Sequence, residues 1–137
     1  MKEAVIVSAA RTPIGRAFRG AFNNLQSPSM SSHAIVAAVA RAGVDPAEID
    51  DCIMGAAMQQ GTQSSNLGRQ AAMASGLPVT VSGMTVDRQC SSGLMAISIG
   101  ANNITNDGSS VVVAGGCESI SLIRNEHFNA HRAADPL

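Results

Sequence analysis

Residues 86–106 read VDRQCSSGLMAISIGANNITN, and this segment carries the strongest structural signal in the chain. It predicts the end of a strand at Asp87 and a helix from Ser91 to about Asn106. At about 100° of rotation per residue, the apolar side chains of this helix point around its whole circumference. They are Leu94, Met95, Ala96, Ile97, Ile99, Ala101 and Ile104. A helix that is apolar on every side must be buried on every side, so we expect it to be a central element.

Apolar runs and helical segments alternate along the rest of the chain. Strands are predicted at residues 4–10, 51–58, 84–87 and 110–116, and helices from Ser31 or Ser32 to before Gly43 and from Asn66 to Ser75. The first and last of these strands are apolar throughout, as in strands that helices cover on both faces. The alternation predicts an α/β fold, layered α-β-α around a mostly parallel sheet. These elements are too few to cover the helix of residues 91–106 completely, so something else should pack on it.

The composition fits one soluble domain of 137 residues, of which 45% are hydrophobic and 14% charged. A net charge of −1 without like-charge runs argues against a nucleic-acid partner. No apolar stretch is long enough for a membrane span, and only a handful of apolar residues precede Arg11, too few for a secretory signal. We therefore expect a cytoplasmic protein with neither a membrane nor a nucleic-acid partner. Only 2% of the residues are aromatic, so packing should rely on close approach of backbones.

Cys90 is the strongest catalytic candidate among three widely spaced cysteines. Their odd number and their spacing fit neither a disulfide framework nor a zinc site, so free thiols are expected. Between a strand end and a helix start, the Cys90 thiol lies near unpaired helix N–H groups, which favour a thiolate and suit an oxyanion on an attacked thioester carbonyl. Arg88 would assist if its side chain points the same way. The alternative is a buried cysteine acting as a small hydrophobic residue, which is the interpretation favoured for Cys52 and Cys117.

No metal site or bound nucleotide is predicted. His127 and His131 stand four residues apart, but no third ligand is evident in this terminal segment. His33 lies near a helix start and is expected to be exposed. Gly115-Gly116 is interpreted as a close-packed strand end, because the chain has no glycine-rich phosphate loop.

Four blocks of sequence resemble the thiolase family, in order and over nearly the whole chain. Residues 5–15 (VIVSAARTPIG) are similar to the family's opening segment. Residues 54–55 (MG), 60–63 (QGTQ) and 66–70 (NLGRQ) resemble its second block. Residues 87–93 (DRQCSSG) resemble the block around its nucleophile, and residues 115–119 (GGCES) the strand end that leads into its loop domain.

The resemblance implies the N-terminal half of the thiolase fold and an acyl transfer that depends on coenzyme A. Cys90 would be the nucleophile and would hold the acyl group as a thioester, with backbone N–H groups facing the oxyanion. The substrate would be an acyl-CoA or 3-ketoacyl-CoA, in the formation or cleavage of acetoacetyl-CoA or a 3-ketoacyl-CoA. Coenzyme A thus enters as a substrate, and no cofactor is expected to be bound permanently. The complete enzyme is expected to be a homo-oligomer, a dimer or tetramer.

Thiolase chains are much longer, so the resemblance implies that this chain is an N-terminal portion only. Residues 1–117 would be the core domain without its last strand, and residues 118–137 the start of the loop domain. The C-terminal half would be absent, and with it the glycine-histidine-proline block that activates the nucleophile and a later cysteine block. Residues 125–128 (NEHF) superficially resemble a family motif that belongs to that second half. We therefore expect activity only together with a complementary C-terminal thiolase segment.

Two alternatives stay open beside this interpretation. One is a non-catalytic, thiolase-like fragment that associates with a full-length or complementary chain, with residues 84–87 as the edge strand of contact. The other is an enzyme like the ketoacyl synthases, which share the fold and a cysteine nucleophile. Those enzymes usually have another serine after Cys-Ser-Ser, where this chain has Gly93, so this alternative ranks below the first.

Overall fold

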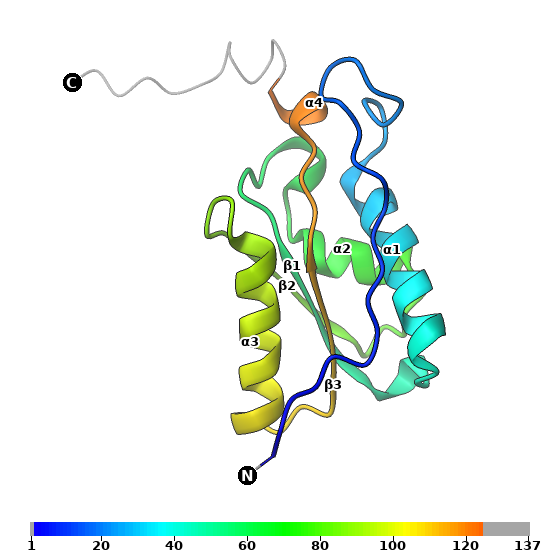
Figure 1. Cartoon of the computed structure of the whole chain (residues 1–137), viewed down its shortest axis with the longest axis vertical. Coiled ribbons are helices and arrows are strands. Elements are labelled where there is room, and N and C mark those ends of the chain that lie inside the picture. Colours follow the sequence, from blue (N-terminus) through cyan, green and yellow to red (C-terminus); the bar gives the residue numbers. More distant parts are fainter. Residues whose placement is uncertain (1, 125–137) are drawn as a thin grey trace, which may run out of the picture.

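The computed structural model describes residues 2–124, which form a three-stranded parallel sheet with helices on its faces (Figure 1). The strands are β1 (Ile49–Gly55), β2 (Ser82–Val86) and β3 (Val111–Gly116), and their order in the sheet is β2-β1-β3. Ile53 of the central strand lies opposite Met84 of β2 and Ala114 of β3. The layered α/β fold with a parallel sheet, expected from the alternation of apolar runs and helices, is confirmed.

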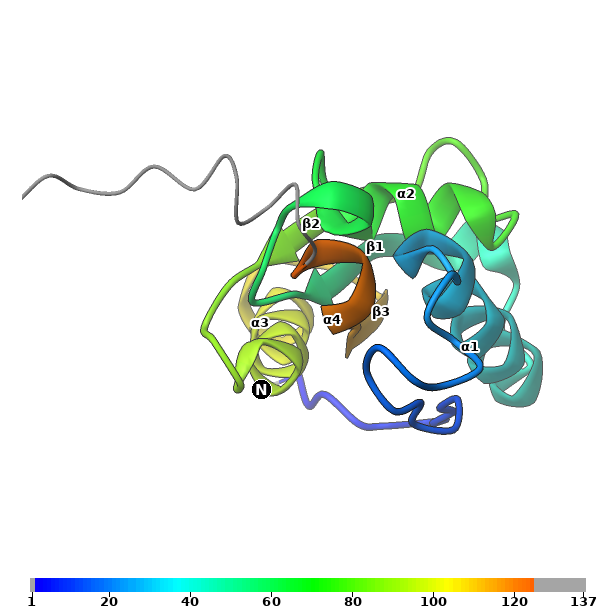
Figure 2. The same ribbon diagram turned by 90° about the horizontal axis from the view of Figure 1, so that it is seen from above.

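Helices lie on both faces of this sheet. They are α1 (Ser27–Ala42), α2 (Leu67–Ala74) and α3 (Ser92–Asn106). The short α4 (Ile120–Ile123) lies beyond the end of β3 and contacts the 3-10 turn η2 (Gly61–Gln63), and a second 3-10 turn, η1 (Pro46–Glu48), precedes β1. The chain crosses from β1 through α2 to β2 in one direction, and from β2 through α3 to β3 in the other. Because crossovers between parallel strands are right-handed, these opposite steps place α2 and α3 on opposite faces, as Figure 2 shows. α1 packs against α2.

Helix ends follow local sequence signals. Gly43 takes the left-handed φ of 67° after α1, and Asn66 caps α2 by accepting a hydrogen bond of 3.1 Å from Arg69 N. Both features confirm the predictions made at these positions. The predicted start of the first helix at Ser31 or Ser32 is wrong: α1 begins at Ser27, because Pro28 suits the first turn of a helix, where its missing N–H has no intrahelical partner to lose.

The core is centred on β1, which lies between the other two strands. Cys52, Leu67 and Val81 are fully buried members of one apolar cluster, and Ile53 is fully buried as well. Burying an aliphatic side chain of this kind stabilises the fold by about 1.5–3 kcal/mol. The strand predicted at residues 51–58 therefore exists, although it begins at Ile49 and ends at Gly55.

The predicted strand at residues 4–10 is not formed. Val5, Ile6 and Val7 are 70%, 79% and 67% exposed, and the segment belongs to no sheet in the described residues. A strand is stabilised by hydrogen bonds to a neighbour as well as by its apolar side chains. Here a cavity of about 980 Å³ lies between this segment and β3. The sheet consequently has three strands in the described chain instead of the expected four.

Helix α3 is only half covered. Ala96 and Gly100 are buried, whereas Leu94 and Ile97 are 72% and 40% exposed. Residues 2–124 thus leave apolar side chains of α3 in contact with solvent. The expectation that these elements are too few to cover it is confirmed.

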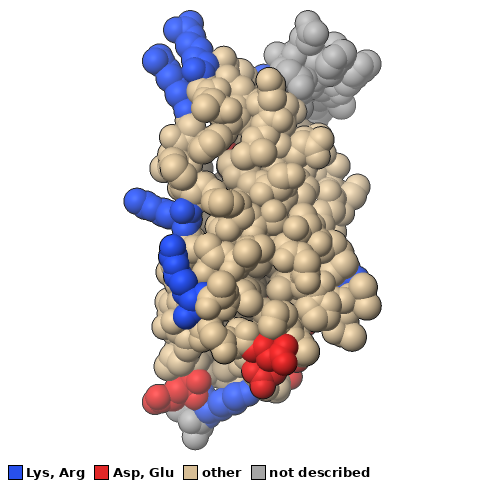
Figure 3. Space-filling model, turned by 90° about the vertical axis from the view of Figure 1, so that its right-hand side faces the viewer, with Lys and Arg blue, Asp and Glu red and all other residues tan. Residues whose placement is uncertain are grey.

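Figure 3 shows how charges are distributed over one face of the molecule. Lys and Arg side chains follow one edge of this face, acidic side chains gather at one end, and most of the remaining area is uncharged. No continuous basic patch of the kind that binds nucleic acid is seen on this face. Among residues 2–124, no helix combines the length and the apolar character needed to span a membrane.

Candidate active site

Cys90 lies in a tight turn between the end of β2 and the start of α3. Gln89 takes a left-handed backbone conformation with φ of 50°, which turns the chain sharply just before the cysteine. Ser91 N donates to Arg88 O at 3.1 Å, and Ser92 N donates to Gln89 O at 3.0 Å. The turn leaves Cys90 exposed at the surface. Its thiol is therefore accessible to a substrate, as a nucleophile requires.

The side chain of Ser92 braces this turn from inside. Its hydroxyl donates to Gln89 O at 2.6 Å and accepts from Arg88 N at 2.8 Å. Ser92 is only 4% exposed, while Asp87 Oδ1 accepts from Gln89 N at 2.7 Å on the other side. Sequence reasoning did not assign these roles. The tendency of serine and aspartate side chains to bond to nearby backbone groups in turns is the signal that could have predicted them.

Glycines let the start of α3 approach the sheet closely. A Cβ atom at Gly55 would collide with the carbonyl group of Ser92, and one at Gly116 would lie 2.9 Å from the Cα of Gly93. Such distances are too short for any larger residue without a backbone shift. The Cys90 turn is therefore held at the carboxyl ends of the parallel strands, where the sites of such sheets gather. The close backbone packing expected from the low aromatic content is observed here.

In the described chain, the guanidinium of Arg88 makes no hydrogen bond to Cys90. Its Nη1 lies 3.8 Å from the sulfur of Met95, and the side chain is exposed. The suggestion that Arg88 assists Cys90 directly thus finds no contact to support it.

The other two cysteines pack in the interior. Cys52 is fully buried, and burial, together with the negative charge of Asp51, raises the pKa of its thiol to about 12. Burial also raises the pKa of Cys117, whose sulfur lies 3.8 Å from Ser27 O. Since the thiolate is the reactive form, both thiols are poor nucleophiles near neutral pH. Their predicted packing roles are confirmed.

A polar cluster of the exposed Glu118 and the buried Gln63 ties the loops at the ends of β1 and β3 together. The carboxylate of Glu118 accepts hydrogen bonds from Ala57 N at 2.8 Å, Met58 N at 3.3 Å and Gln63 Nε2 at 2.6 Å. Gln63 is fully buried, and its Oε1 accepts from Ser27 Oγ at 3.2 Å and from Ser119 N. Its Nε2 also donates to Met58 O at 2.9 Å.

Sequence reasoning missed this cluster, although it singled out both motifs that build it. Gln63 belongs to a polar loop of residues 59–65 and had no visible reason to be buried. Glu118 follows a strand end in residues 115–119. These hydrogen bonds pair every polar atom of the buried Gln63 amide, which would otherwise be costly to bury.

No metal centre is formed by residues 2–124, in which no three His, Cys, Asp or Glu side chains converge. His127, His131 and the NEHF segment at 125–128 lie outside the described residues. Within the described part of the chain, His33 is the only histidine, and it is exposed on α1, as expected. α1 packs on α2 rather than against α3, so no described histidine is placed as a base beside Cys90.

Comparison with known proteins gives a consistent result. The family model "Thiolase, N-terminal domain" matches residues 4–135. The acetyl-CoA acetyltransferase of Cupriavidus necator is 42% identical over 88% of this chain and 30% of its own length. The 3-ketoacyl-CoA thiolase of Bacillus subtilis is 40% identical over 90% of this chain and 32% of its own.

The crystal structure of the Bacillus anthracis acetyl-CoA acetyltransferase superimposes with a TM-score of 0.83, at 40% identity, over 98% of this chain and 34% of that chain. The chain thus spans about a third of the length of the curated relatives it matches. The chain belongs to the thiolase family and corresponds to its N-terminal domain.

Proposed function

We propose that this chain supplies the nucleophile of a coenzyme A-dependent acyltransferase, and that Cys90 is that nucleophile. The exposure of Cys90 on a braced turn at the carboxyl ends of the strands carries the proposal. The names of its relatives support the substrate class, because they are acetyl-CoA acetyltransferases and 3-ketoacyl-CoA thiolases.

In the proposed reaction the Cys90 thiolate attacks the carbonyl carbon of an acyl-CoA. The new carbon–sulfur bond forms as the bond to coenzyme A breaks, and the coenzyme A thiolate leaves and is protonated. An acetyl-CoA deprotonated beside its carbonyl then attacks the acyl-enzyme and releases Cys90, giving a 3-ketoacyl-CoA, which is acetoacetyl-CoA when the acyl group is acetyl. In the opposite direction, free coenzyme A takes the acyl group from Cys90. Two covalent steps of this kind predict ping-pong kinetics.

Activity is proposed to require a complementary C-terminal thiolase segment. Residues 2–124 place no histidine beside Cys90, and general bases contribute about 10²–10⁴-fold to such reactions. Residues 1–117 would form the core domain and residues 118–137 the start of a loop domain. The complete enzyme would be a cytoplasmic homo-oligomer that uses coenzyme A as a substrate and holds no permanent cofactor.

The test is acetylation of Cys90 by acetyl-CoA, measured by intact mass and peptide mapping. The chain is co-expressed with the C-terminal two-thirds of the Cupriavidus necator enzyme. An acetyl group that replaces the thiol hydrogen adds about 42 Da, and this adduct is expected at Cys90. Cys90→Ser should abolish the adduct, whereas Cys117→Ser, which removes a half-buried thiol, should retain it. An adduct that survives in Cys90→Ser would show that the nucleophile is another residue.

A non-catalytic fragment is the second candidate, and the absence of a described base beside Cys90 favours it. Such a chain would associate with a thiolase partner without being acylated. The intact mass of the purified protein, measured under denaturing conditions, distinguishes the split enzyme from the non-catalytic fragment. A companion chain about twice as large supports a split enzyme, and a single 14.0 kDa species supports the fragment.

A further inference from the structure

The residue directly before Cys90 has an unusual backbone conformation. Gln89 is one of four non-glycine residues within residues 2–124 that have a positive φ, and its φ is 50°. In this left-handed conformation the Cβ atom lies too close to the following carbonyl oxygen, so a residue such as glutamine adopts it rarely. It persists only where the surrounding structure holds it. The contacts of Gln89 therefore decide how the chain enters Cys90.

Both backbone polar groups of Gln89 make hydrogen bonds. Its N–H donates to Asp87 Oδ1 at 2.7 Å, and its carbonyl oxygen accepts from Ser92 Oγ at 2.6 Å and from Ser92 N at 3.0 Å. Ser92 is buried at the start of α3, whereas Asp87 follows the last residue of β2. The turn is therefore bonded to the helix on one side and to the end of the strand on the other.

The conformation of Gln89 determines where Cys90 begins. The N–H of Gln89 belongs to the peptide plane that precedes its Cα atom, and its carbonyl group belongs to the plane that follows. The φ and ψ angles of Gln89 set the rotation between these two planes, and the second plane carries the N–H and the Cα of Cys90. Holding both groups of Gln89 therefore fixes the point from which the Cys90 side chain leaves the turn.

The carboxylate of Asp87 is committed to this contact. Asp87 is exposed, and within residues 2–124 its side chain bonds to Gln89 N and to no other group. The guanidinium of the neighbouring Arg88 lies against the sulfur of Met95 instead. A carboxylate is a stronger acceptor for a backbone N–H than a neutral group is. Asp87 is thus the one described side chain that holds the N–H of Gln89.

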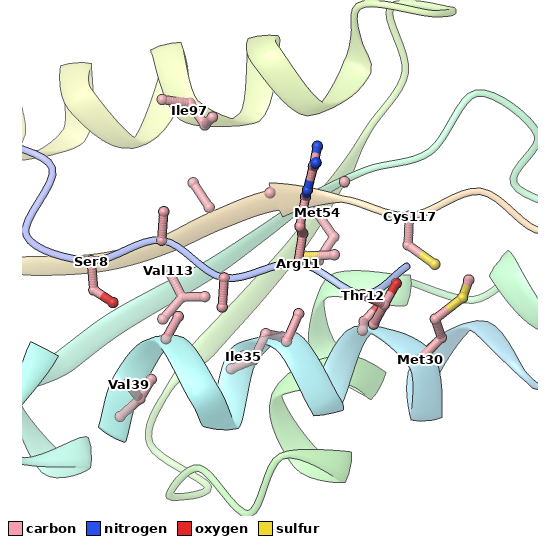
Figure 4. Close-up of a pocket in the computed structure, with 18 of the residues that line it drawn as sticks. Ser8, Arg11, Thr12, Met30, Ile35, Val39, Met54, Ile97, Val113 and Cys117 are labelled. Atoms are coloured by element: carbon pink, nitrogen blue, oxygen red, sulfur yellow. The ribbon is translucent and has the colours of Figure 1, made fainter. Parts of the chain in front are cut away.

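The large cavity beside β3 does not shape this turn. Ile35 and Val39 of α1 and Ile97 of α3 are among the residues that line the cavity (Figure 4). None of residues 86–92 lines it. The hydrogen bonds of the turn, and not the walls of this cavity, therefore hold Gln89 in place.

We propose that Asp87 is a positioning residue for Cys90. Its carboxylate keeps Gln89 in the left-handed conformation and thereby fixes the place from which the Cys90 thiol meets an acyl-CoA. The effect on acyl transfer rests on the proposed function, whereas the hydrogen bond to Gln89 is a property of the turn itself. Asp87 acts through Gln89 and contacts neither the thiol nor the substrate.

Hydrogen exchange at the Gln89 amide tests the first step of this inference. The chain is studied in complex with the C-terminal two-thirds of the Cupriavidus necator enzyme, by mass spectrometry with fragmentation that resolves single amides. We expect this amide to exchange about tenfold faster in Asp87→Ala, because its N–H loses its acceptor. Asp87→Asn keeps the Oδ1 acceptor and should exchange at close to the parental rate. An unchanged rate in Asp87→Ala would overturn the inference.

Acetylation of Cys90 in the same complex tests the second step. Misplacing a reacting group by about 1 Å can slow a reaction about 100-fold, so we expect Asp87→Ala to lower the rate at saturating acetyl-CoA by about tenfold or more. The acetyl-CoA concentration at half-maximal rate should stay within about twofold, because Asp87 does not contact the substrate. Asp107→Ala is the matched control, at an exposed aspartate beyond the other end of α3, and should leave both quantities unchanged.

Two variants separate positioning from a general loss of structure. Asp87→Asn should acetylate at close to the parental rate. Gln89→Gly, introduced into Asp87→Ala, should restore most of the lost rate, because glycine adopts the left-handed conformation without support. Asp87 and Gln89 are both exposed, so these variants should fold. If Asp87→Asn is as slow as Asp87→Ala, or if the glycine restores nothing, Asp87 does not position Cys90 through Gln89.

Failure of this inference is distinguishable from failure of the proposed function. A parent complex that is not acetylated at Cys90 refutes the proposed function, and exchange of the Gln89 amide still decides whether Asp87 holds the turn. If the parent is acetylated and Asp87→Ala reacts at the same rate, the positioning role is refuted and the proposed function stands. A change confined to the half-saturating concentration would also refute it, because Asp87 would then contact acetyl-CoA.

Discussion

Gln63 and Glu118 are 55 residues apart in sequence, yet Gln63 Nε2 donates a hydrogen bond of 2.6 Å to Glu118 Oε1. This bond joins the loop after β1 to the segment after β3. Both loops lie at the carboxyl end of the sheet, beside the turn that presents Cys90. The pair therefore belongs to the framework of the candidate active site, and neither side chain hydrogen-bonds to Cys90 in the described chain.

Removing the carboxylate should destabilise this framework. Glu118→Ala removes the acceptor of Ala57 N, Met58 N and the buried Gln63 Nε2, at an expected cost of about 1 kcal/mol in the free energy of unfolding, because Glu118 itself is exposed. The change in the free energy of unfolding is measured by urea unfolding followed by circular dichroism. Glu48→Ala, at an exposed glutamate whose side chain makes no hydrogen bond within the described residues, should change stability by less than about 0.5 kcal/mol. Equal losses in both variants would contradict a role for the cluster.

The hydroxyl of Ser92 should matter more for the Cys90 turn than its small size suggests. Ser92→Ala removes the bonds to Gln89 O and Arg88 N, with an expected loss of about 1–2 kcal/mol in stability. In the complex with the C-terminal segment, we also expect Cys90 acetylation to slow at least tenfold, because the turn loses its brace. Ser98 lies on the exposed face of the same helix, so Ser98→Ala is the control. Unchanged acetylation in Ser92→Ala would show that the turn holds its shape without this hydroxyl.

Adjacent glycines at the end of β3 should differ sharply in their tolerance of a methyl group. A Cβ at Gly116 lies 2.9 Å from Gly93 Cα, whereas one at Gly115 meets only the sulfur of Met54, at 3.9 Å. Gly116→Ala should therefore cost about 1–3 kcal/mol, and Gly115→Ala should be close to neutral. Thermal or urea unfolding of the two variants decides the matter, and similar stabilities would refute the close approach of α3 to β3.

The pH dependence of stability should carry a contribution from Cys52. Its pKa is raised from the ordinary 9.0 to about 12 in the folded chain, so the folded state holds the thiol proton more tightly than the unfolded state. The resulting stabilisation is complete below about pH 9 and is lost as the pH rises toward 12. The free energy of unfolding should fall less steeply over this range in Cys52→Ala than in the parent chain. Parallel curves for the two proteins would contradict the buried, neutral thiol.

Alkylation should rank the three thiols by access. Iodoacetamide at pH 8 should modify exposed Cys90 first in the native chain, and Cys52 only after unfolding. Peptide mapping after a time course gives the order of modification. Early labelling of Cys52 would mean that the core around β1 opens readily.

Local signals in the sequence predicted much of the fold. Three of its features depend on neighbouring residues alone. They are the helix of residues 91–106 with apolar side chains on every side, the glycine after α1 and the asparagine cap of α2. The parallel sheet follows from the alternation of such elements. Cys90 was placed correctly between a strand and a helix for the same reason, since both neighbours are encoded nearby.

The features that escaped prediction depend on contacts between distant parts of the chain. Residues 4–10 have the composition of a strand, but a strand forms only where a hydrogen-bonding neighbour lies beside it, and here a cavity separates them from β3. Gln63 is buried because Glu118, Ser27 and Ser119 surround its amide, and none of these is near it in sequence. Residue types and their spacing therefore specified the elements and the place of Cys90 between a strand and a helix, because propensity, capping and periodicity act locally. The three-dimensional packing alone settled which edges pair and which polar groups are buried, because both depend on what lies across the fold.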